Sequence, residues 1–246
     1  MALVKFDGQN HLAMMGKNLI RLFPNYHVSY IDPFLFLDHF AIQKPSGFPD
    51  HPHRGFEIIT YVLDGAVAHA DSAGHESVIE KLGVQRVLAG RGIIHSEMPG
   101  TDGIDHGLQL WINLPRAEKK LDPEYQELRP NELPVEVIEG IRIRHLVGSD
   151  SPVAMRRPMS YQDLAWESDT EHVMDIPADY QGFIYVLAGA GQLNDEQSAK
   201  KGDLFFLTGE EDARKFRVTG EAGFRMVIAI GQPVGERPIF NGSFVD

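Results

Sequence analysis

The sequence contains no cysteine among its 246 residues. Disulfide bonds and thiolate ligands are therefore excluded, and with them zinc ribbons and iron–sulfur clusters. Any metal site in this chain must use nitrogen and oxygen ligands, which histidine and the carboxylates supply.

The sequence also lacks long apolar runs and an excess of positive charge. No stretch of about 18 apolar residues is present, so we expect no transmembrane helix and no membrane partner. The first eight residues carry no apolar signal core, which predicts a cytoplasmic protein. With 23 basic and 35 acidic side chains the net charge is −12, which disfavours direct binding to a nucleic-acid backbone.

Two pairs of potential metal ligands stand out from this background. His51 and His53 lie two residues apart, and His95 and Glu97 repeat the same spacing. In an extended chain, side chains at positions i and i+2 leave the same face of the strand. Eleven histidines would produce about 0.5 His-x-His pairs by chance, so it is the second pair that gives the pattern weight.

Three imidazoles and one carboxylate leave one or two positions open on a metal that prefers five or six ligands. A reacting metal needs such open positions, whereas a purely structural metal does not. Nitrogen and oxygen ligands suit iron, manganese, nickel, cobalt, copper and zinc alike. The pattern therefore predicts one divalent transition metal, without fixing which one.

The rest of the chain reads as short strands separated by turn residues, with no long helical period. Residues 115–134 hold four prolines and many charges, which indicates a connection between two domains. Tyr61–Gly65 and Tyr185–Gly189 have similar sequences, so the two halves echo one another. We therefore expect an all-β chain built from two related β-barrels or sandwiches.

Several stretches resemble the pirin family, above all His-Pro-His-Arg-Gly-Phe-Glu at 51–57 and Ala-Gly-Arg-Gly-Ile-Ile-His-Ser-Glu-Met-Pro at 89–99. Leu108–Pro115 and the tail from Gly231 to Ile239 add to the resemblance, which covers nearly the whole chain. It implies a bicupin, that is, two cupin-type β-barrels in tandem. The expected parts are a metal-binding barrel at 1–114, a linker at 115–134 and a metal-free barrel at 135–246.

The resemblance also selects among the ligands. The general cupin pattern would use Glu57, four residues after His53, whereas pirins bind the metal through the residue that matches Glu97. The metal ligands implied are His51, His53, His95 and Glu97, with Glu57 left to support a ligand or to serve as a buried polar residue. No histidine occurs after His172, which agrees with a metal-free second barrel.

Strand parity suggests which side chains surround the metal. Counting by twos from His53 places Glu57 and Ile59 inward. Phe48, Ile59 and Trp111 are then candidates for an apolar pocket, and either Gln109 or Trp111 is a candidate to line the metal cavity. A tryptophan buried between the sheets is an equally good interpretation of Trp111.

The resemblance implies two alternative functions. One is a dioxygenase that cleaves flavonols such as quercetin, with iron as the favoured metal and Glu97 or Glu57 as the base for the substrate hydroxyl. The other is a regulatory protein that binds a protein partner, a transcription factor or a metabolic enzyme, with the metal as a structural or redox switch. Fold and ligand set do not separate these functions.

Overall fold

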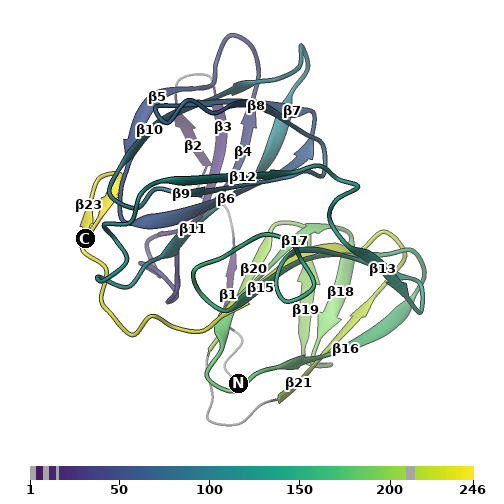
Figure 1. The fold of residues 1–246 in the computed structure, drawn as a ribbon. Coiled ribbons are helices and arrows are strands. Elements are labelled where there is room, and N and C mark those ends of the chain that lie inside the picture. Colours follow the sequence, from purple (N-terminus) through teal and green to yellow (C-terminus); the bar gives the residue numbers. More distant parts are fainter. Residues whose placement is uncertain (1–3, 8–10, 15–16, 209–213) are drawn as a thin grey trace. The chain divides into compact units, whose positions relative to one another are not determined.

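A computed structural model describes residues 4–7, 11–14, 17–208 and 214–246. The described residues form strands and turns, and no helix is present among them (Figure 1). A helix able to cross a membrane is accordingly absent from this part of the chain. The expected all-β architecture with two barrels is confirmed.

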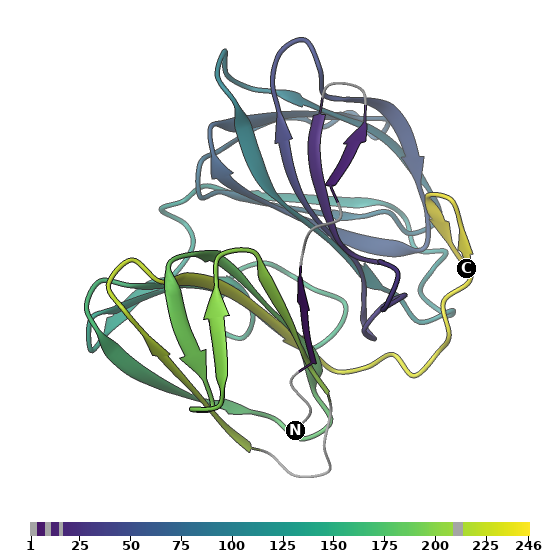
Figure 2. The same ribbon diagram turned by 180° about the vertical axis from the view of Figure 1, so that it is seen from behind.

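The chain divides into two compact units whose ends are exchanged. One unit, here called the first barrel, comprises Gln9–Glu132 and Val234–Asp246; the other, the second barrel, comprises Met1–Gly8 and Leu133–Pro233. The sequence boundaries placed each end of the chain in the nearer barrel, whereas the structure assigns both ends to the farther one. Pairing between strands distant in sequence causes this: β1 (Val4–Asp7) runs antiparallel to β20 (Asp203–Leu207). Figure 2 shows β1, in dark purple, next to the green strands of the second barrel.

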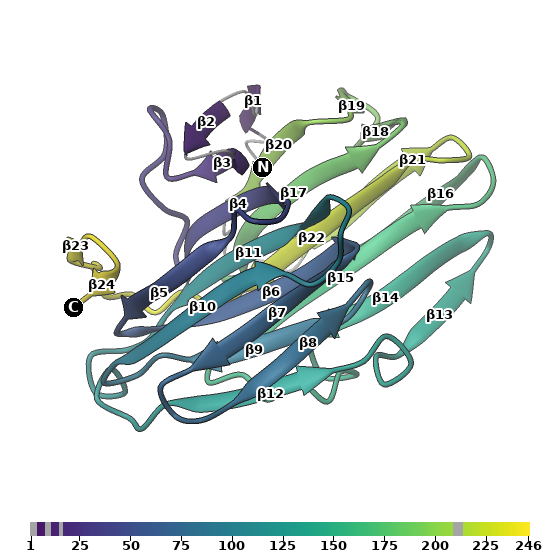
Figure 3. The same ribbon diagram turned by 90° about the horizontal axis from the view of Figure 1, so that it is seen from above.

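The first barrel consists of two antiparallel sheets that face each other. The seven-stranded sheet has the order β12 (Glu124–Leu128), β9 (Val84–Leu88), β6 (Phe56–Asp64), β11 (Asp105–Asn113), β4 (Phe34–Ile42), β3 (Lys17–Phe23) and β2 (His11–Met14). The four-stranded sheet has the order β5 (Phe48–His53), β10 (Ile93–Pro99), β7 (Ala66–Asp71) and β8 (Glu76–Glu80), and Figure 3 shows these four strands side by side.

The predicted linker is only partly a connection. Glu124–Leu128 forms β12, which pairs with β9 along its whole length, and Tyr125 accepts a hydrogen bond from Gln85 at 3.2 Å. Residues up to Glu132 belong to the first barrel. The prolines and charges of this stretch therefore mark an edge strand and its turns, where prolines are tolerated, rather than a free linker.

Strand parity does not continue from β5 into β6, which corrects the inward assignment of Glu57 and Ile59. The two strands belong to different sheets and are joined by a corner at Arg54 and Gly55, where Gly55 has a φ of 91°. The even-numbered residues of β6 consequently face the barrel interior: Thr60 contacts Glu97, and Phe56 packs against His53. Glu57 and Ile59 are buried on the opposite face of the strand.

The second barrel repeats this architecture. Its seven-stranded sheet has the order β1, β20, β17 (Gln181–Ala188), β22 (Arg225–Gly231), β15 (Met159–Trp166), β14 (Ile141–Val147) and β13 (Val135–Ile138). Its four-stranded sheet has the order β16 (Thr170–Ile176), β21 (Arg214–Gly220), β18 (Ala190–Leu193) and β19 (Gln197–Lys200). β16 and β21 thus occupy the places that β5 and β10 hold in the first barrel.

The strand register identifies what stands at the ligand positions of the second barrel. Aligning the two similar hairpins places Leu193 where His69 stands, so Val218, the partner of Leu193, corresponds to Glu97, the partner of His69. The same ladders relate the other ligand positions of the two barrels. Met174, Ile176 and Phe216 thereby correspond to His51, His53 and His95. None of these side chains is an imidazole or a carboxylate. The metal-free second barrel, predicted from the absence of histidine after His172, stays a prediction that this register supports.

Candidate metal centre

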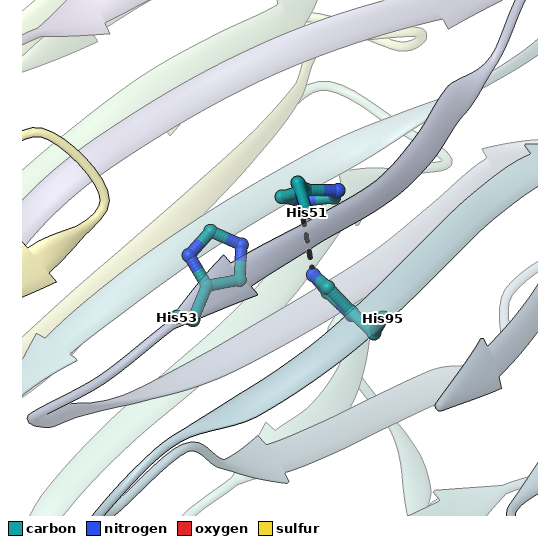
Figure 4. Close-up of side chains that lie close together, drawn as sticks. All are labelled: His51, His53 and His95. Carbon is teal, nitrogen blue, oxygen red and sulfur yellow. Dashed lines mark hydrogen bonds between the residues drawn. The ribbon is translucent and has the colours of Figure 1, made fainter. Parts of the chain in front are cut away.

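Neighbouring strands of the four-stranded sheet bring the two histidine pairs together. β5 and β10 run antiparallel with His51 directly opposite His95, and His53 stands opposite Ile93. Within the described part of the chain, His51, His53 and His95 form a group whose ligand atoms all lie within 4.8 Å of one another. Figure 4 shows the three rings around a common space, with 3.1 Å between the Nε2 atoms of His51 and His95.

The electrostatics of the triad favour neutral imidazoles. Burial, and to a lesser extent the neighbouring histidines, lower the pKa of His53 and of His95 to about 3. His51 Nδ1 lies 2.8 Å from the carbonyl oxygen of Pro49. With the Nδ1 proton donated to that carbonyl, Nε2 carries the lone pair that a metal requires.

The unsatisfied polar atoms of the site fit a metal. Both ring nitrogens of His53 and Nδ1 of His95 are buried without a hydrogen-bond partner. Buried polar atoms of this kind are rare in folded proteins because each costs free energy. A divalent transition metal held by the triad would take one ring nitrogen of His53, which the protein itself leaves unpaired, so the residues present suit such a metal.

Glu97 lies beside the triad but is held by other side chains. Its carboxylate accepts hydrogen bonds from Gln109 Nε2 at 2.9 and 2.7 Å and from Thr60 Oγ1 at 3.1 Å. Trp111 Nε1 in turn donates to Gln109 Oε1 at 3.1 Å, which fixes the orientation of the amide. Glu97 does not belong to the cluster of ligand atoms, so its role as a fourth ligand stays a prediction.

Glu57 serves a different purpose. Its carboxylate accepts hydrogen bonds from Arg86 at 2.9 and 2.6 Å, and both side chains are almost completely buried. Arg86 also pairs with Glu124 of β12 at 2.7 Å. Glu57 therefore anchors the edge strand of the barrel, which agrees with the buried polar alternative for this residue.

A cavity of about 620 Å³ opens beside the triad. Phe48, Gln109 and Trp111 line it as expected, whereas Ile59 does not, because it lies on the other face of β6. Trp111 is stacked between Phe36 and Phe56, with ring centroids 4.3 and 4.2 Å away. The cavity is lined by Leu19, Arg21, Pro24, Phe36, Asp38, Phe40, Phe48, His51, His53, Glu97, Gln109, Trp111, Phe240, Gly242 and Ser243.

Sequence reasoning missed three polar residues of this region. Asp38 pairs with Arg21 at 3.0 Å in the cavity wall, Thr60 holds Glu97, and His69 lies opposite Glu97 with its ring 5.4 Å from that of His95. The alternation of Phe36, Asp38 and Phe40 within a very apolar strand was the available signal for Asp38. Nothing in the local sequence marks Thr60, whose direction depends on the corner at Gly55.

The contrast between the two glutamates gives a first prediction. Glu97→Ala should lower the metal affinity at least about 10–100-fold, the scale seen when even a supporting partner of a ligand is lost. Glu57→Ala should leave the metal content near that of the unchanged protein but cost about 3 kcal/mol of stability, because it breaks a buried ion pair. Elemental analysis measures the metal content, and urea unfolding measures the stability. Loss of metal in Glu57→Ala together with full metal in Glu97→Ala would contradict both roles.

Asp38 gives a second prediction, on pH. Burial raises the pKa of Asp38 from 3.8 to about 6, although the Arg21 partner opposes the shift. The folded state therefore binds this proton more tightly than the unfolded state. The protonated Asp38 carboxyl therefore contributes fully to the stability of the folded state below about pH 4, and this contribution is lost as the pH rises through 6.

In metal-free protein, Asp38→Asn should remove this dependence on pH. The unfolding free energy of the variant minus that of the unchanged protein should therefore rise by at most about 3 kcal/mol between about pH 4 and pH 7.5. Unfolding in urea at several pH values measures this growth. Asp102→Asn is the matched control, because Lys44 lowers the pKa of the exposed Asp102 and no such growth is expected. A flat difference for Asp38→Asn would show that this carboxyl keeps its ordinary pKa.

Comparison with known proteins places this fold and site. The family model named Pirin matches residues 16–112, and that of the Pirin C-terminal cupin domain matches residues 161–246. A pirin-like protein of Solanum lycopersicum is 40% identical over 220 residues, which cover 87% of this chain and 76% of that protein.

Solved structures agree with this assignment. A quercetin 2,3-dioxygenase from Acinetobacter baumannii is 26% identical with a TM-score of 0.89, and the match covers 99% of this chain and 90% of that one. The bacterial pirin YhhW from Escherichia coli, in complex with nickel(II), shares the fold at 21% identity and a TM-score of 0.80, covering 94% of this chain and 100% of that one. The two barrels are cupin domains, and the chain belongs to the pirin family.

Proposed function

We propose that this protein is a metal-dependent dioxygenase that cleaves flavonols such as quercetin with dioxygen. The observation that carries the proposal is the triad of His51, His53 and His95, of which His53 and His95 are buried, beside an aromatic cavity. The similarity to a quercetin 2,3-dioxygenase supports the same class of substrate, a small aromatic molecule.

The three histidines would hold the metal, and we propose Glu97 as the fourth ligand. When bound, the metal supplies a Lewis acid for the substrate oxygen and an open position for dioxygen. The ligand set suits iron, which we propose on the family resemblance, but it also suits nickel, manganese, cobalt, copper and zinc. Nickel is tested beside iron because the Escherichia coli relative was solved in complex with nickel(II).

The cavity supplies the surface for a flat substrate. Phe36, Phe48 and Trp111 line it, and Phe36 and Phe56 hold Trp111 between them. Aromatic rings fixed in this way bury a flat ligand without losing much rotamer freedom, and they exclude water from the reacting atoms. Gln109, held by Trp111, keeps the carboxylate of Glu97 at the same wall.

Two carboxylates are placed to accept the proton of a substrate hydroxyl. Glu97 lies beside the triad, and its Oε2, which accepts one hydrogen bond from Gln109, keeps a lone pair for a proton. Asp38 lines the same cavity, and its pKa of about 6 makes it a proton acceptor near neutral pH. We propose Glu97 as the base, and Asp38 as the group that receives a second hydroxyl hydrogen bond.

The experiment is consumption of quercetin by the full chain after loading with iron, nickel, manganese, cobalt or copper in turn. The visible absorbance of quercetin should fall in air with at least one of these metals. Exclusion of dioxygen or addition of a chelator should slow this loss by on the order of 100-fold or more. Absence of turnover with every metal would overturn the enzymatic proposal and favour the regulatory alternative, which a pull-down of protein partners would then examine.

A further inference from the structure

The second barrel contains a cavity of about 810 Å³ at the mouth that corresponds to the metal-site cavity of the first barrel. The strand register gives this correspondence. Ile230 and Ser160 pair with one another as Trp111 and Phe36 do, and Gln162 takes the place of Asp38. The duplicated fold has thus kept the opening while exchanging the residues around it.

The apolar part of this cavity differs in character from the aromatic wall of the first barrel. Ile176, Phe216 and Val218, which replace three metal ligands, are completely buried in the core, and the fourth replacement, Met174, lines the cavity. Met155 and Met159 line it as well, together with Ile228 and Ile230. Flexible thioether side chains adapt to irregular aliphatic shapes better than stacked rings do.

Arg157 brings a charge with an unused donor to this apolar cavity. Its guanidinium is held by one hydrogen bond, from Nη2 to the carbonyl oxygen of Pro233 at 3.2 Å. The Nε atom is buried and has no hydrogen-bond partner. An unpaired buried donor on a charged group is costly, and an anion with oxygen acceptors removes the cost.

The acidic residues at the same mouth do not supply that acceptor. Glu136 lines the cavity, but its carboxylate lies 2.9 Å from His145 Nε2. Asp175 is exposed to solvent. Arg156 is a second cation of the lining, so two arginines and two carboxylates lie next to the methionine and isoleucine surface.

We infer that the second barrel is a metal-independent binding site for a small amphipathic anion. Its aliphatic body packs against Met174, Ile228 and Ile230, and its carboxylate or sulfonate pairs with the guanidinium of Arg157. The site shares no residue with the metal centre, and this inference does not depend on the proposed dioxygenase activity.

The test uses octanoate as the probe, titrated calorimetrically into the full chain with and without a chelator. Octanoate should bind equally well in both cases, and 1-octanol, which lacks the charge, at least about 10-fold more weakly. Arg157→Ala should weaken octanoate binding at least about 10-fold, and Arg157→Lys less, since lysine keeps the charge but not the planar donor. Ile230→Trp, which fills the cavity, should abolish it.

Arg21→Ala is the matched control, because it removes an arginine from the cavity of the first barrel and should leave octanoate binding unchanged. A crystal of the full chain with 8-bromooctanoate locates the probe through its bromine, which is expected among the residues of the second cavity. The inference is overturned if 1-octanol binds as tightly as octanoate. It is equally overturned if folded Arg157→Ala and Arg157→Lys bind like the unchanged chain, or if bromine lies only in the first barrel.

Discussion

Replacing His53 by Ala should reduce the bound metal from one per chain to a small fraction. His53 contributes one of three imidazoles, and neither ring nitrogen has a hydrogen-bond partner, so one of them is free to bind the metal. The loss of affinity should exceed the roughly 10–100-fold that removal of a supporting hydrogen bond costs, since a ligand itself is removed. Elemental analysis of protein purified without added chelator measures the effect.

The same substitution should leave the β-fold intact. His53 is buried, but it makes no hydrogen bond that the barrel needs, so metal-free His53→Ala and metal-free unchanged protein should unfold within about 2 kcal/mol of one another. His172→Ala is the matched control, because it removes a histidine from the second barrel and should keep the metal. Full metal content in the His53 variant would remove this residue from the ligand set.

The three histidines were predictable because their positions depend on local spacing. His51 and His53 share one face of one strand, and a single antiparallel pairing then brings His95 opposite His51. Glu97 was proposed from the same spacing and chosen over Glu57 by the resemblance, and its role as a ligand stays a prediction. A β-bulge separates His95 from Glu97 in the ladder with β5, and Gln109 and Thr60 hold the carboxylate.

The wrong parity of Ile59 and Glu57 has a single physical cause. Alternation holds within one strand, and the chain turns a corner at Gly55 between two sheets before Ile59 is reached. Both faces of β6 are apolar, because the strand is buried on both sides. Its sequence therefore has no apolar–polar alternation that would show which face points into the barrel. Thr60, one residue farther along, therefore holds Glu97 in the place that parity assigned to its neighbours.

The exchanged chain ends lay beyond sequence reasoning for a different reason. β1 pairs with a strand that follows about 200 residues later, and the tail packs against residues about 190 positions earlier. Short strands of four and two residues carry little pattern of their own. The partner of each short strand is a strand edge of a barrel with unpaired backbone groups, and such an edge exists only once the barrel has formed.

The corner at Gly55 should also be the most sensitive backbone position near the metal site. A Cβ atom added there would lie 1.8 Å from the carbonyl oxygen of Val245, far inside van der Waals contact. The backbone of Val245 is held at this point by a hydrogen bond, since its amide donates to the carbonyl oxygen of Arg54 at 2.9 Å. Gly55→Ala must therefore push the tail away from the barrel.

Displacing the tail should cost more than backbone strain alone. Val245 is completely buried in one core cluster with Phe56 and Trp111, so its expulsion should remove about 1.5–3 kcal/mol of burial and loosen the aromatic wall of the cavity. Gly74→Ala is the matched control, with a φ of 95° close to the 91° of Gly55 and no atom within 4 Å of the added Cβ. Both variants carry the cost of positive φ, about 1–2 kcal/mol, which cancels in the comparison.

Urea unfolding of the two variants isolates the contribution of the tail. We expect Gly55→Ala to be less stable than Gly74→Ala by at least about 1.5 kcal/mol and to exchange the amide hydrogens of Ile239 and Val245 faster, because both amides are hydrogen-bonded in the closed tail. Equal stability of the two variants would show that the tail yields without cost and that the cavity wall does not depend on it. The metal should persist in Gly55→Ala in either case, because the histidines stand on β5 and β10 and are held by sheet pairing rather than by the tail.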